Sequence, residues 1–472
     1  MKKSALLGGV LLVAFIVFGI FTFGAKSSVP SDVSCKDCNV IIIGVDTLRA
    51  DHVHALGYPL DTTPTIDALA DKGFVFSQAI SASSWTVPAF MSIMTGVYPS
   101  VHRVTNKYVE FDPKDTKKQI LSNLEALSPG IGTLAEEMKS AGYATGGFTG
   151  DAGVGHAFGY SQGFDVYTDE KAFGGLENSD THVLTWLDSL KPDQKFFMFF
   201  HGYDLHGQFT LASSSKSFIP QDYTGPYTGS PEEEAKLRED QLVAPLSLTP
   251  ADVGFWKGLY DSKVHAADSQ LAKFLSQLQE RGLLQHTIIV LVSDHGEEWY
   301  EHGGVDHGQS LYDELIHVPL IVSVPGAKSG VVPSQVSTMD IAPTILDLLG
   351  ISPDAVFAKQ LEGKSLLPYM TGRETGPGRD IFVETDYRDF THKRAVRTAD
   401  GWKYIITLES GKEELYNLNV DPSEKDNIVL KEVEKATVLK NQLREHIEVT
   451  LGGTLSSPAK TGCLPVYPTE CI

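Results

Sequence analysis

Cysteine is scarce in this chain of 472 residues, and the four cysteines lie near its two ends. No cysteine is therefore available as a nucleophile in the interior. Cys35 and Cys38 precede the first predicted strand, and Cys463 and Cys471 close the sequence. Their even number predicts two disulfides in an oxidising compartment; three pairings are open, and we expect one that fastens the stem to the C-terminus. The alternative for Cys35-x-x-Cys38 is a zinc site, but the second pair lacks the matching spacing.

Basic residues are also few. The chain has 39 lysines and arginines against 60 acidic residues, which gives a formal net charge of −21. Nucleic-acid-binding proteins need clusters of positive charge against the phosphate backbone. The composition therefore argues against a nucleic-acid partner. The length is enough for one large domain with a smaller companion.

The longest hydrophobic run lies at the N-terminus. Lys2 and Lys3 precede an apolar run from Ala5 to Gly24. A run of this length can cross a bilayer, and Phe23-Gly24-Ala25 is a poor match to a signal-peptide cleavage site. We therefore expect residues 1–25 to be a membrane anchor that holds the protein in the bacterial periplasm or at the cell surface. A cleaved signal peptide, which would leave a secreted protein, is the alternative.

After a polar linker at 26–38, the chain alternates between predicted strands and helices. Continuous apolar runs at 39–45, 195–200 and 287–292 are typical of buried parallel strands. The clearest helical pattern between them repeats apolar residues every three or four positions from Tyr260 to Leu278. This alternation predicts an α/β fold with a large, mostly parallel sheet flanked by helices on both faces. We expect this domain to span residues 39–376.

The composition changes near Pro377. Residues 380–387 predict a strand, a hairpin turns at Asp400-Gly401, and a charged helix runs from Leu430 to Val449. Residues 377–472 are therefore predicted to form a small C-terminal α+β subdomain.

Each of the three apolar strands ends in polar side chains that can bind a ligand. In open α/β sheets, sites form beyond the carboxyl ends of the strands. One such residue would mean little, but three strand ends together indicate a site. The residues are Asp46 after the first strand, His201, Asp204 and His206 after the second, and Asp294 and His295 after the third.

Short motifs follow one another in a fixed order along most of the chain. They are DTLRADH at 46–52, SWTVPAFMSIMTG at 84–96, HGYDLH at 201–206, SDHGE at 293–297, GKSLLP at 363–368 and ELYNL at 414–418. This series resembles the sulfatase family of the alkaline-phosphatase superfamily. Each motif alone is weak, but the ordered set covers residues 39–430 and is specific. The resemblance implies an alkaline-phosphatase-like fold and metal-dependent cleavage of esters.

Residues 84–96 match the nucleophile motif of that family, which is C-x-P-x-R followed by T-G. With Pro88 and Thr95-Gly96 aligned, the nucleophile position falls on Thr86. Pro88 suits the first turn of a helix, and the N-terminus of a helix has free N–H groups that favour a tetrahedral anion. We therefore predict that Thr86 is the catalytic nucleophile, although a lone threonine there would be taken for a helix-capping residue.

The strand-end residues supply a set of metal ligands for this nucleophile. Asp46, Asp294 and His295 offer two carboxylates and an imidazole, and Thr86 completes the set. A hydroxyl is a poor nucleophile unless a cation lowers its pKa, which is what a metal does. A ligand set that contains histidine favours Zn²⁺ or Mn²⁺ over Ca²⁺ or Mg²⁺. We therefore predict a divalent-metal enzyme.

A second group of residues is predicted to contact the substrate. By the resemblance, His206 matches a histidine that contacts the anionic group of the ester, with Leu205 in place of the family's proline. His307 lies near the position of a substrate-binding lysine. The alternative for Asp204, His206 and His307 is a second metal site, as in the two-metal phosphatases of the superfamily.

Two departures from the sulfatase pattern bear on the chemistry. Sulfatases oxidise a cysteine or serine to formylglycine and carry an arginine four residues later, whereas this chain has Thr86 and Phe90. Threonine cannot give the aldehyde. The family's lysine and histidine pair is also missing after Thr145. By the resemblance, threonine is the nucleophile in phosphodiesterases, phosphatases and phospho-alcohol transferases of the superfamily, which pass through a phospho-threonine.

We therefore predict metal-dependent hydrolysis of a phosphate monoester or diester of a small molecule, a glycan or a lipid. Two other enzymatic hypotheses stay open, namely hydrolysis of sulfuric esters without the aldehyde and phospho-alcohol transfer. A hypothesis of another class is an inactive, membrane-anchored binding module. Phe90 in place of arginine supports that hypothesis, and the presence of all four predicted metal ligands opposes it.

Overall fold

The computed structural model describes residues 33–105, 126–171, 173–207, 211, 216–388 and 391–450, together with the backbone of strands β3 (Tyr108–Glu110) and β4 (Ile120–Leu121). The predicted membrane anchor and Cys463 and Cys471 lie outside the described residues. Within the described part of the chain, none of the helices combines the length and the apolar character that a bilayer crossing requires.

A nine-stranded sheet forms the centre of the molecule, and it confirms the predicted fold class. Most neighbouring strands are parallel. The exceptions are β11, which is antiparallel to β2, and β12, which is antiparallel to both β2 and β8. The order is β11-β2-β12-β8-β1-β7-β5-β6, with β13 beside β2. The strands are β1 (Asn39–Val45), β2 (Phe74–Ile80), β5 (Ala144–Phe148), β6 (Val166–Thr168), β7 (Phe196–Gly202), β8 (Thr287–Val292), β11 (His317–Val318), β12 (Leu320–Ser323) and β13 (Gly330–Ser337).

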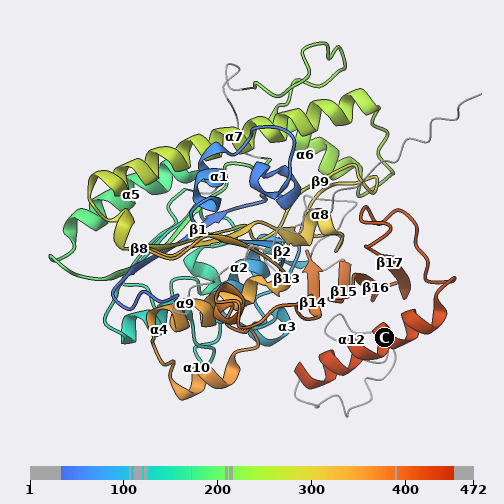
Figure 1. Ribbon diagram of the computed structural model, residues 1–472. Coiled ribbons are helices and arrows are strands. Elements are labelled where there is room, and N and C mark those ends of the chain that lie inside the picture. The colour runs from blue at the N-terminus through green and yellow to red at the C-terminus, as the bar shows by residue number, and fades with distance from the viewer. Residues whose placement is uncertain are drawn as a thin grey trace, which may run out of the picture.

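Helices cover both faces of this sheet (Figure 1). One face carries α1 (Pro64–Ala70), α5 (Leu176–Ser189), α6 (Pro231–Asp240) and α7 (Pro250–Glu280). The other carries α2 (Thr86–Thr95), α3 (Pro99–His102), α4 (Leu134–Ser140), α9 (Ile341–Leu349) and α10 (Ala355–Gln360). The central strand β1 is apolar at almost every position because both of its faces are buried. Val40 and Ile42 pack into one core, and Ile41 and Ile43 into the other.

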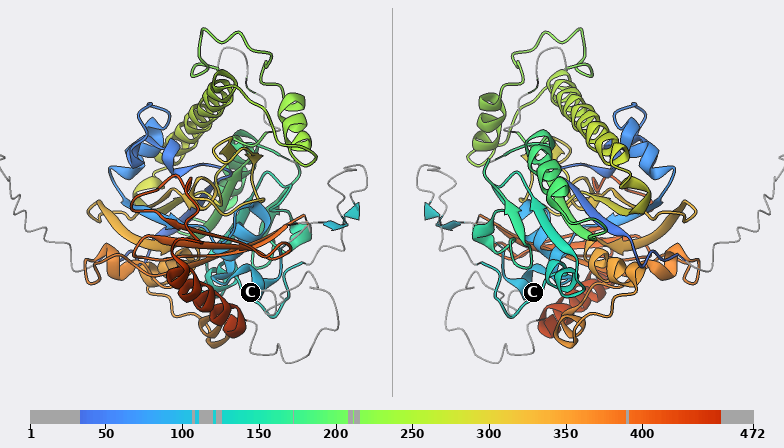
Figure 2. Two further views of the ribbon diagram at one scale, coloured as in Figure 1. Left: turned by 90° about the vertical axis from the view of Figure 1, so that its right-hand side faces the viewer. Right: turned by 90° about the vertical axis from the view of Figure 1, so that its left-hand side faces the viewer.

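A smaller antiparallel sheet follows, made of β14 (Ile381–Tyr387), β15 (Thr391–Arg397), β16 (Trp402–Thr407) and β17 (Lys412–Asn417). The predicted turn lies between β15 and β16, where Gly401 has a φ of 87°. Helix α12 (Val433–Thr450) lies along one face of this sheet and buries Leu439 and Leu443 against it (Figures 1 and 2). The predicted boundary at 376–377 falls between α11 (Leu367–Met370) and β14.

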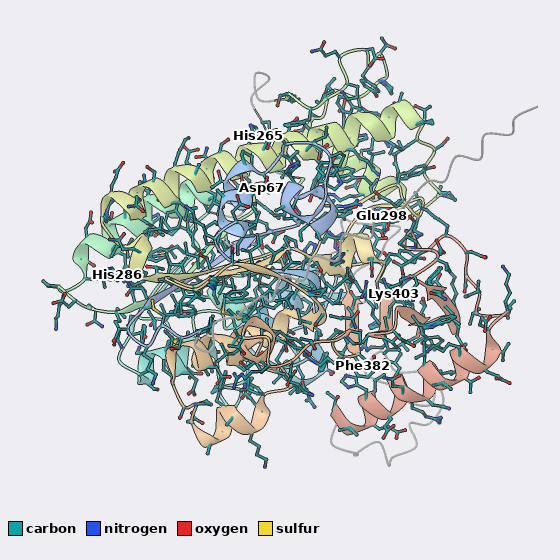
Figure 3. The ribbon with its side chains drawn as sticks, in the orientation of Figure 1. Asp67, His265, His286, Glu298, Phe382 and Lys403 are labelled. Atoms are coloured by element: carbon teal, nitrogen blue, oxygen red, sulfur yellow. A yellow bond between two sulfur atoms is a disulfide. The ribbon has the colours of Figure 1, made fainter. Side chains whose placement is uncertain are left out.

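Buried ion pairs join the small sheet to the large domain. Lys403 lies on β16 of the small sheet (Figure 3). Its Nζ lies 2.9 Å from Asp313 of α8 (Asp313–Ile316) in the large domain and 2.8 Å from Glu424, which follows the small sheet. Arg397 on β15 binds the same Asp313 carboxylate at 2.9 Å. Removing one partner of such a buried pair leaves an uncompensated charge, so these pairs tie the small sheet to α8 of the large domain.

The cysteine pairing differs from our expectation. Cys35 and Cys38 form a disulfide with each other, with their Cα atoms 5.4 Å apart. The stem is therefore not fastened to the C-terminus by these two residues, and the zinc alternative for the pair is wrong. Packing holds the stem instead: Val33 and Cys38 are buried, and the Cys35 N–H donates to the carbonyl of Leu348 in α9 at 2.8 Å.

Candidate active site

The predicted site residues meet at the carboxyl ends of three adjacent strands. Strand β1 lies between β7 and β8, so Val45 pairs with Gly202 of β7 and Gly44 pairs with Val292 of β8. Asp46 follows β1 at once, and Asp294 follows β8 after one residue. The strand ends that the sequence marked as polar are therefore neighbours in space, as predicted.

Thr86 is the first residue of α2, and its side chain does not cap that helix. Trp85 is the N-cap residue, and the helix has no side-chain capping hydrogen bond. The Thr86 hydroxyl instead lies 3.3 Å from Asp46 Oδ2 and 3.2 Å from His295 Nε2. The helix-cap alternative is therefore wrong, because this hydroxyl faces the strand-end residues.

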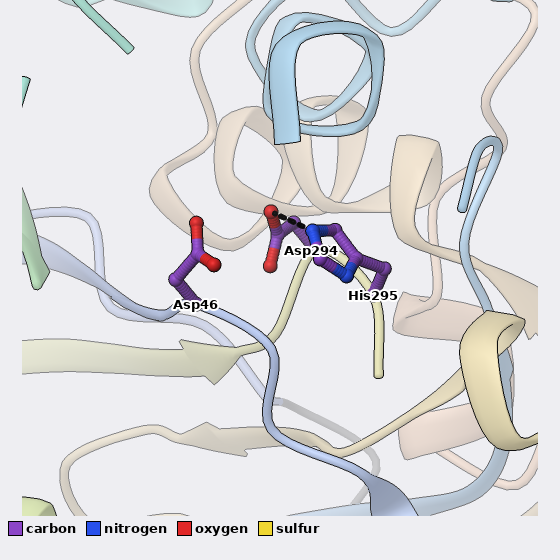
Figure 4. Close-up of side chains that lie close together, drawn as sticks. All are labelled: Asp46, Asp294 and His295. Atoms are coloured by element: carbon purple, nitrogen blue, oxygen red, sulfur yellow. Dashed lines mark ion pairs between the residues drawn. The ribbon is translucent and has the colours of Figure 1, made fainter. Parts of the chain in front are cut away.

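Asp46, Asp294 and His295 form a compact, buried group of metal-ligand side chains (Figure 4). Their ligand atoms all lie within 4.8 Å of one another. Asp46 Oδ1 and Asp294 Oδ2 accept no hydrogen bond although both are buried. His295 Nδ1 lies 2.8 Å from the carbonyl of Gly296, so it carries the proton and leaves the Nε2 lone pair facing Asp294 Oδ2 at 3.3 Å.

The electrostatics of this group fit a divalent cation. Burial raises the pKa of Asp46 well above its usual value, and repulsion by Asp294 raises it further. Burial also raises the pKa of Asp294, and it lowers the pKa of His295 to about 4. The neutral imidazole is the form that binds metals. A cation among these lone pairs would offset the cost of burying two carboxylates side by side.

The loop that carries Asp46 is braced by the long helix α7. Tyr260 donates its hydroxyl proton to the carbonyl of Thr47 at 2.6 Å and accepts the N–H of Arg49 at 2.9 Å. Thr47 has a φ of 59°, and its N–H donates to Asp294 Oδ1 at 3.2 Å. The strained backbone of Thr47 thus directs its N–H to Oδ1 of Asp294, which leaves Oδ2 of the same carboxylate available to a cation.

His201, near the end of β7, lies beside Asp46 on the other side. Its Nε2 lies 3.4 Å from Asp46 Oδ2, and its Nδ1 accepts the N–H of Gly150 at 3.4 Å. Burial lowers the pKa of His201 to about 3, so the ring is neutral and its Nε2–H faces the carboxylate. The sequence marked His201 as a strand-end residue but gave it no role, and the strand-end signal was enough to find it.

Phe90 stands where the sulfatase motif has arginine, and it is a core residue. Its ring centroid lies 4.9 Å from that of His201 and 5.4 Å from that of Phe199. A Cβ atom on Gly44 of β1 would lie 2.8 Å from the Phe90 ring, so the glycine makes room for it. Phe90 therefore packs beneath the strand ends, and its presence removes none of the predicted metal ligands.

The three residues predicted to bind substrate or a second metal do not form one group. The centroids of His206 and His307 are 5.1 Å apart, and that of His307 is 4.3 Å from that of His295. Asp204 is turned away, with its Oδ2 accepting the N–H of Leu176 at the start of α5 at 2.8 Å. The structure therefore does not group these three residues as a second metal site.

Instead, the potential metal-ligand residues grouped with His307 in the described part of the chain are Glu297 and Asp306. His307 Nδ1 lies 3.2 Å from Glu297 and 3.2 Å from Asp306. Sequence patterns gave no signal for this grouping, because neither carboxylate directly follows an apolar strand of the large sheet.

A pocket of about 120 Å³ opens beside Thr86. Gly153 leaves space there, since a Cβ atom on it would lie 3.1 Å from Thr86 Cγ2. The two cationic side chains of the pocket, Arg238 and Arg388, lie in no motif that pointed to a site. The remaining lining residues are Trp85, Val87, Ala152, Phe173, Tyr203, His206, Asp306, His307 and Tyr387.

A larger cavity, of about 770 Å³, lies at the seam between the two sheets. Arg49, Glu301, Asp313 and Arg397 line it, but none of the predicted catalytic residues does. Its arginines are already bound to acidic partners, Arg49 to Glu301 at 2.8 Å and Arg397 to Asp313 at 2.9 Å. The chemistry therefore belongs to the smaller pocket.

A mostly parallel sheet covered by helices on both faces, with potential metal ligands clustered at its strand ends and Thr86 beside them, is the arrangement expected of a hydrolase of the alkaline-phosphatase-like superfamily. Comparisons with known proteins agree. The family model described as sulfatase matches residues 38–351, and the model described as N-sulphoglucosamine sulphohydrolase, C-terminal, matches residues 300–450. The chain therefore belongs to the sulfatase family and is a hydrolase of that family.

A sulfatase of Formosa agariphila is 26% identical over 457 residues, which cover 87% of each chain. A structure solved in complex with its substrate D-glucosamine-2-N,6-O-disulfate has a TM-score of 0.70 at 18% identity, over 90% of this chain and 100% of that one. The phosphonate monoester hydrolase of Agrobacterium radiobacter has a TM-score of 0.66 at 21% identity, over 87% and 95% of the two chains. Similarity at these identities shows the shared fold.

Proposed function

We propose that this protein hydrolyses phosphate monoesters or diesters, with Thr86 as the nucleophile and water as the acceptor. One observation carries the proposal: the Thr86 hydroxyl lies between Asp46 Oδ2 at 3.3 Å and His295 Nε2 at 3.2 Å. Two acceptors thus face the single hydroxyl proton. A threonine cannot form the aldehyde that sulfatases require, so direct attack by its oxygen is the chemistry left to this position.

The chain supplies the parts of this reaction from its own residues. A divalent metal bound by Asp46, Thr86, Asp294 and His295 would supply a lower pKa for the hydroxyl and positive charge for the ester. Thr86 Oγ1 gives up its proton and attacks phosphorus, the bond from phosphorus to the ester oxygen breaks, and the alcohol leaves with a proton, so that a phospho-threonine remains. Water then attacks phosphorus, the bond from phosphorus to Thr86 Oγ1 breaks, the phosphate product leaves and Oγ1 regains a proton.

The start of α2 stabilises the charge that develops. Because the helix begins at Thr86, the N–H groups of Thr86 and Val87 have no carbonyl partner within the helix. Those groups and the helix dipole favour an anion at this point. We propose Zn²⁺ or Mn²⁺ as the metal, because His295 contributes nitrogen to a set that is otherwise oxygen.

Sulfuric ester hydrolysis is the second candidate, and family membership supports it. A paired assay separates the two. On one metal-loaded preparation, we expect kcat/KM for p-nitrophenyl phosphate or its diester to exceed that for p-nitrophenyl sulfate by at least roughly 100-fold, about 2.7 kcal/mol in the transition state. A sulfate ester that is the best of the three substrates would overturn the phosphoester proposal.

We also propose that the protein works outside the cytoplasm, anchored by residues 1–25. The disulfide between Cys35 and Cys38 supports this, because disulfides persist in oxidising compartments. Membrane fractionation of cells that express the full chain and a chain lacking residues 1–25 tests it. Recovery of the full chain from the soluble cytoplasmic fraction would refute the proposal.

A further inference from the structure

Two arginines reach the pocket beside Thr86 from distant parts of the chain. Arg238 lies on α6, near the end of that helix, and Arg388 directly follows β14 of the small sheet. The sulfatase pattern places a lysine and a histidine after the strand that contains Thr145, which is β5, and this chain lacks them. Positive charge therefore enters this pocket from other elements, one of them in the small C-terminal sheet.

The charge balance of the pocket lining is positive. Asp306 is the single carboxylate of the lining, against the two guanidinium groups. Its Oδ1 lies 3.8 Å from Arg238 Nη1. Glu297 contacts His307 from outside the lining at 3.2 Å, and Glu234 is paired with Lys263 at 3.3 Å. Arginine keeps its charge at every relevant pH. Two guanidinium groups therefore face a single carboxylate within the lining, while Glu234 and Glu297 behind it also interact with Arg238.

The walls of the pocket leave little space around the reacting group. Trp85, Tyr203 and Tyr387 are almost fully buried, and Phe173 packs its ring 5.4 Å from that of Tyr203. The volume of about 120 Å³ is small for a binding site. A tetrahedral group with one organic substituent, directed outward, suits this space better than a group that carries two.

We propose that Arg238 and Arg388 select phosphate monoesters over diesters. The inference rests on the proposed function and narrows its substrate class. A monoester carries up to two negative charges on three free oxygens, which two planar guanidinium groups can bind by paired hydrogen bonds. A diester has one charge, and its second organic group would press against the aromatic walls.

The test compares two esters with one leaving group. Turnover of p-nitrophenyl phosphate and methyl p-nitrophenyl phosphate is measured on the metal-loaded full chain and on its Arg238→Gln and Arg388→Gln variants. We expect the wild type to favour the monoester by at least roughly tenfold in kcat/KM. Each variant should lose at least roughly 30-fold on the monoester and less than about threefold on the methyl diester.

Controls separate recognition from folding. Lys236→Gln removes a positive charge from the same helix α6 but at a side chain that is 70% exposed and paired with Asp240, so both esters should react as with the wild type. Arg238→Lys and Arg388→Lys keep the charge and should restore part of the monoester activity. Inorganic phosphate should inhibit the wild type competitively and each Gln variant more weakly.

The outcomes are distinct. A wild type that turns over the methyl diester as well as the monoester overturns the inference but leaves phosphoester hydrolysis standing. Gln variants that lose activity equally on both esters also overturn it, because the arginines would then act on structure alone. Preference for p-nitrophenyl sulfate over both phosphate esters would instead overturn the proposed function itself.

Discussion

The Oγ1 of Thr86 lies 3.2 Å from the Nε2 of His295, although 209 residues separate them in the sequence. The Nδ1 of His295 donates to the carbonyl of Gly296, so the Nε2 that faces Thr86 carries a lone pair. This relationship turns the first residue of a helix into part of a ligand group at the strand ends.

Thr86→Ala should lower kcat/KM by at least roughly 1,000-fold, because it removes the attacking oxygen. The fold should survive, since the Thr86 side chain does not cap α2. Turnover, bound metal and melting temperature are measured together. Thr86→Ser keeps a hydroxyl and serves as the matched control with partial activity. An alanine variant that retains wild-type turnover with unchanged metal content would show that another group is the nucleophile.

Metal removal should abolish turnover. It should also lower the melting temperature, because a ligand that binds only the folded state stabilises that state. Asp294→Asn should weaken metal binding by at least roughly tenfold, because the loss of a residue that only hydrogen-bonds to a metal ligand already lowers metal affinity by about that factor. Elemental analysis after dialysis against limiting Zn²⁺ or Mn²⁺ measures the change. Full activity after exhaustive chelation would show that the chemistry does not depend on a bound metal.

Gly153→Ala should lower kcat/KM by at least roughly tenfold, because the added Cβ atom would lie 3.1 Å from both Thr86 Cγ2 and Tyr203 Oη. Melting temperature should change little. Gly254→Ala is the control: Gly254 lies in α7 with no atom within 4 Å of an added Cβ, so the alanine should stabilise the helix by up to about 1 kcal/mol without affecting turnover. Equal activity of the two variants would mean that space beside Thr86 is not limiting.

The ion pairs of Glu301 should make stability fall in acid. Burial alone would raise the pKa of Glu301, but Arg49 and Lys257 lower it to about 2. A carboxylate whose pKa is lowered in the folded state stabilises the fold at pH values above its unfolded pKa, which is near 4.5. This contribution to stability disappears as the pH falls toward 2. Glu301→Gln should therefore cost roughly 1–3 kcal/mol at pH 7 and much less near pH 2. Urea unfolding at several pH values measures this. A cost that does not vary with pH would exclude the ionic explanation.

Local patterns in the sequence determined much of this molecule. Unbroken apolar runs predicted β1, β7 and β8 because a strand buried on both faces must be apolar at successive positions. The residues that end those runs were predicted to meet, since parallel strands bring their carboxyl ends to one edge of the sheet. Pro88 fixed the position of Thr86 at the start of a helix. These inferences needed neighbouring residues and one rule of sheet geometry.

Only the tertiary structure decided which distant side chains share the pocket. Arg238 of α6 and Arg388 after β14 line the pocket beside Thr86 because whole elements bring them there, and no periodicity in the sequence encodes that packing. Asp204 shares a motif with His206, yet it turns toward the N–H of Leu176 because a buried carboxylate must find a donor. Contacts between residues far apart in the chain depend on how whole elements pack, and a local pattern does not contain that information.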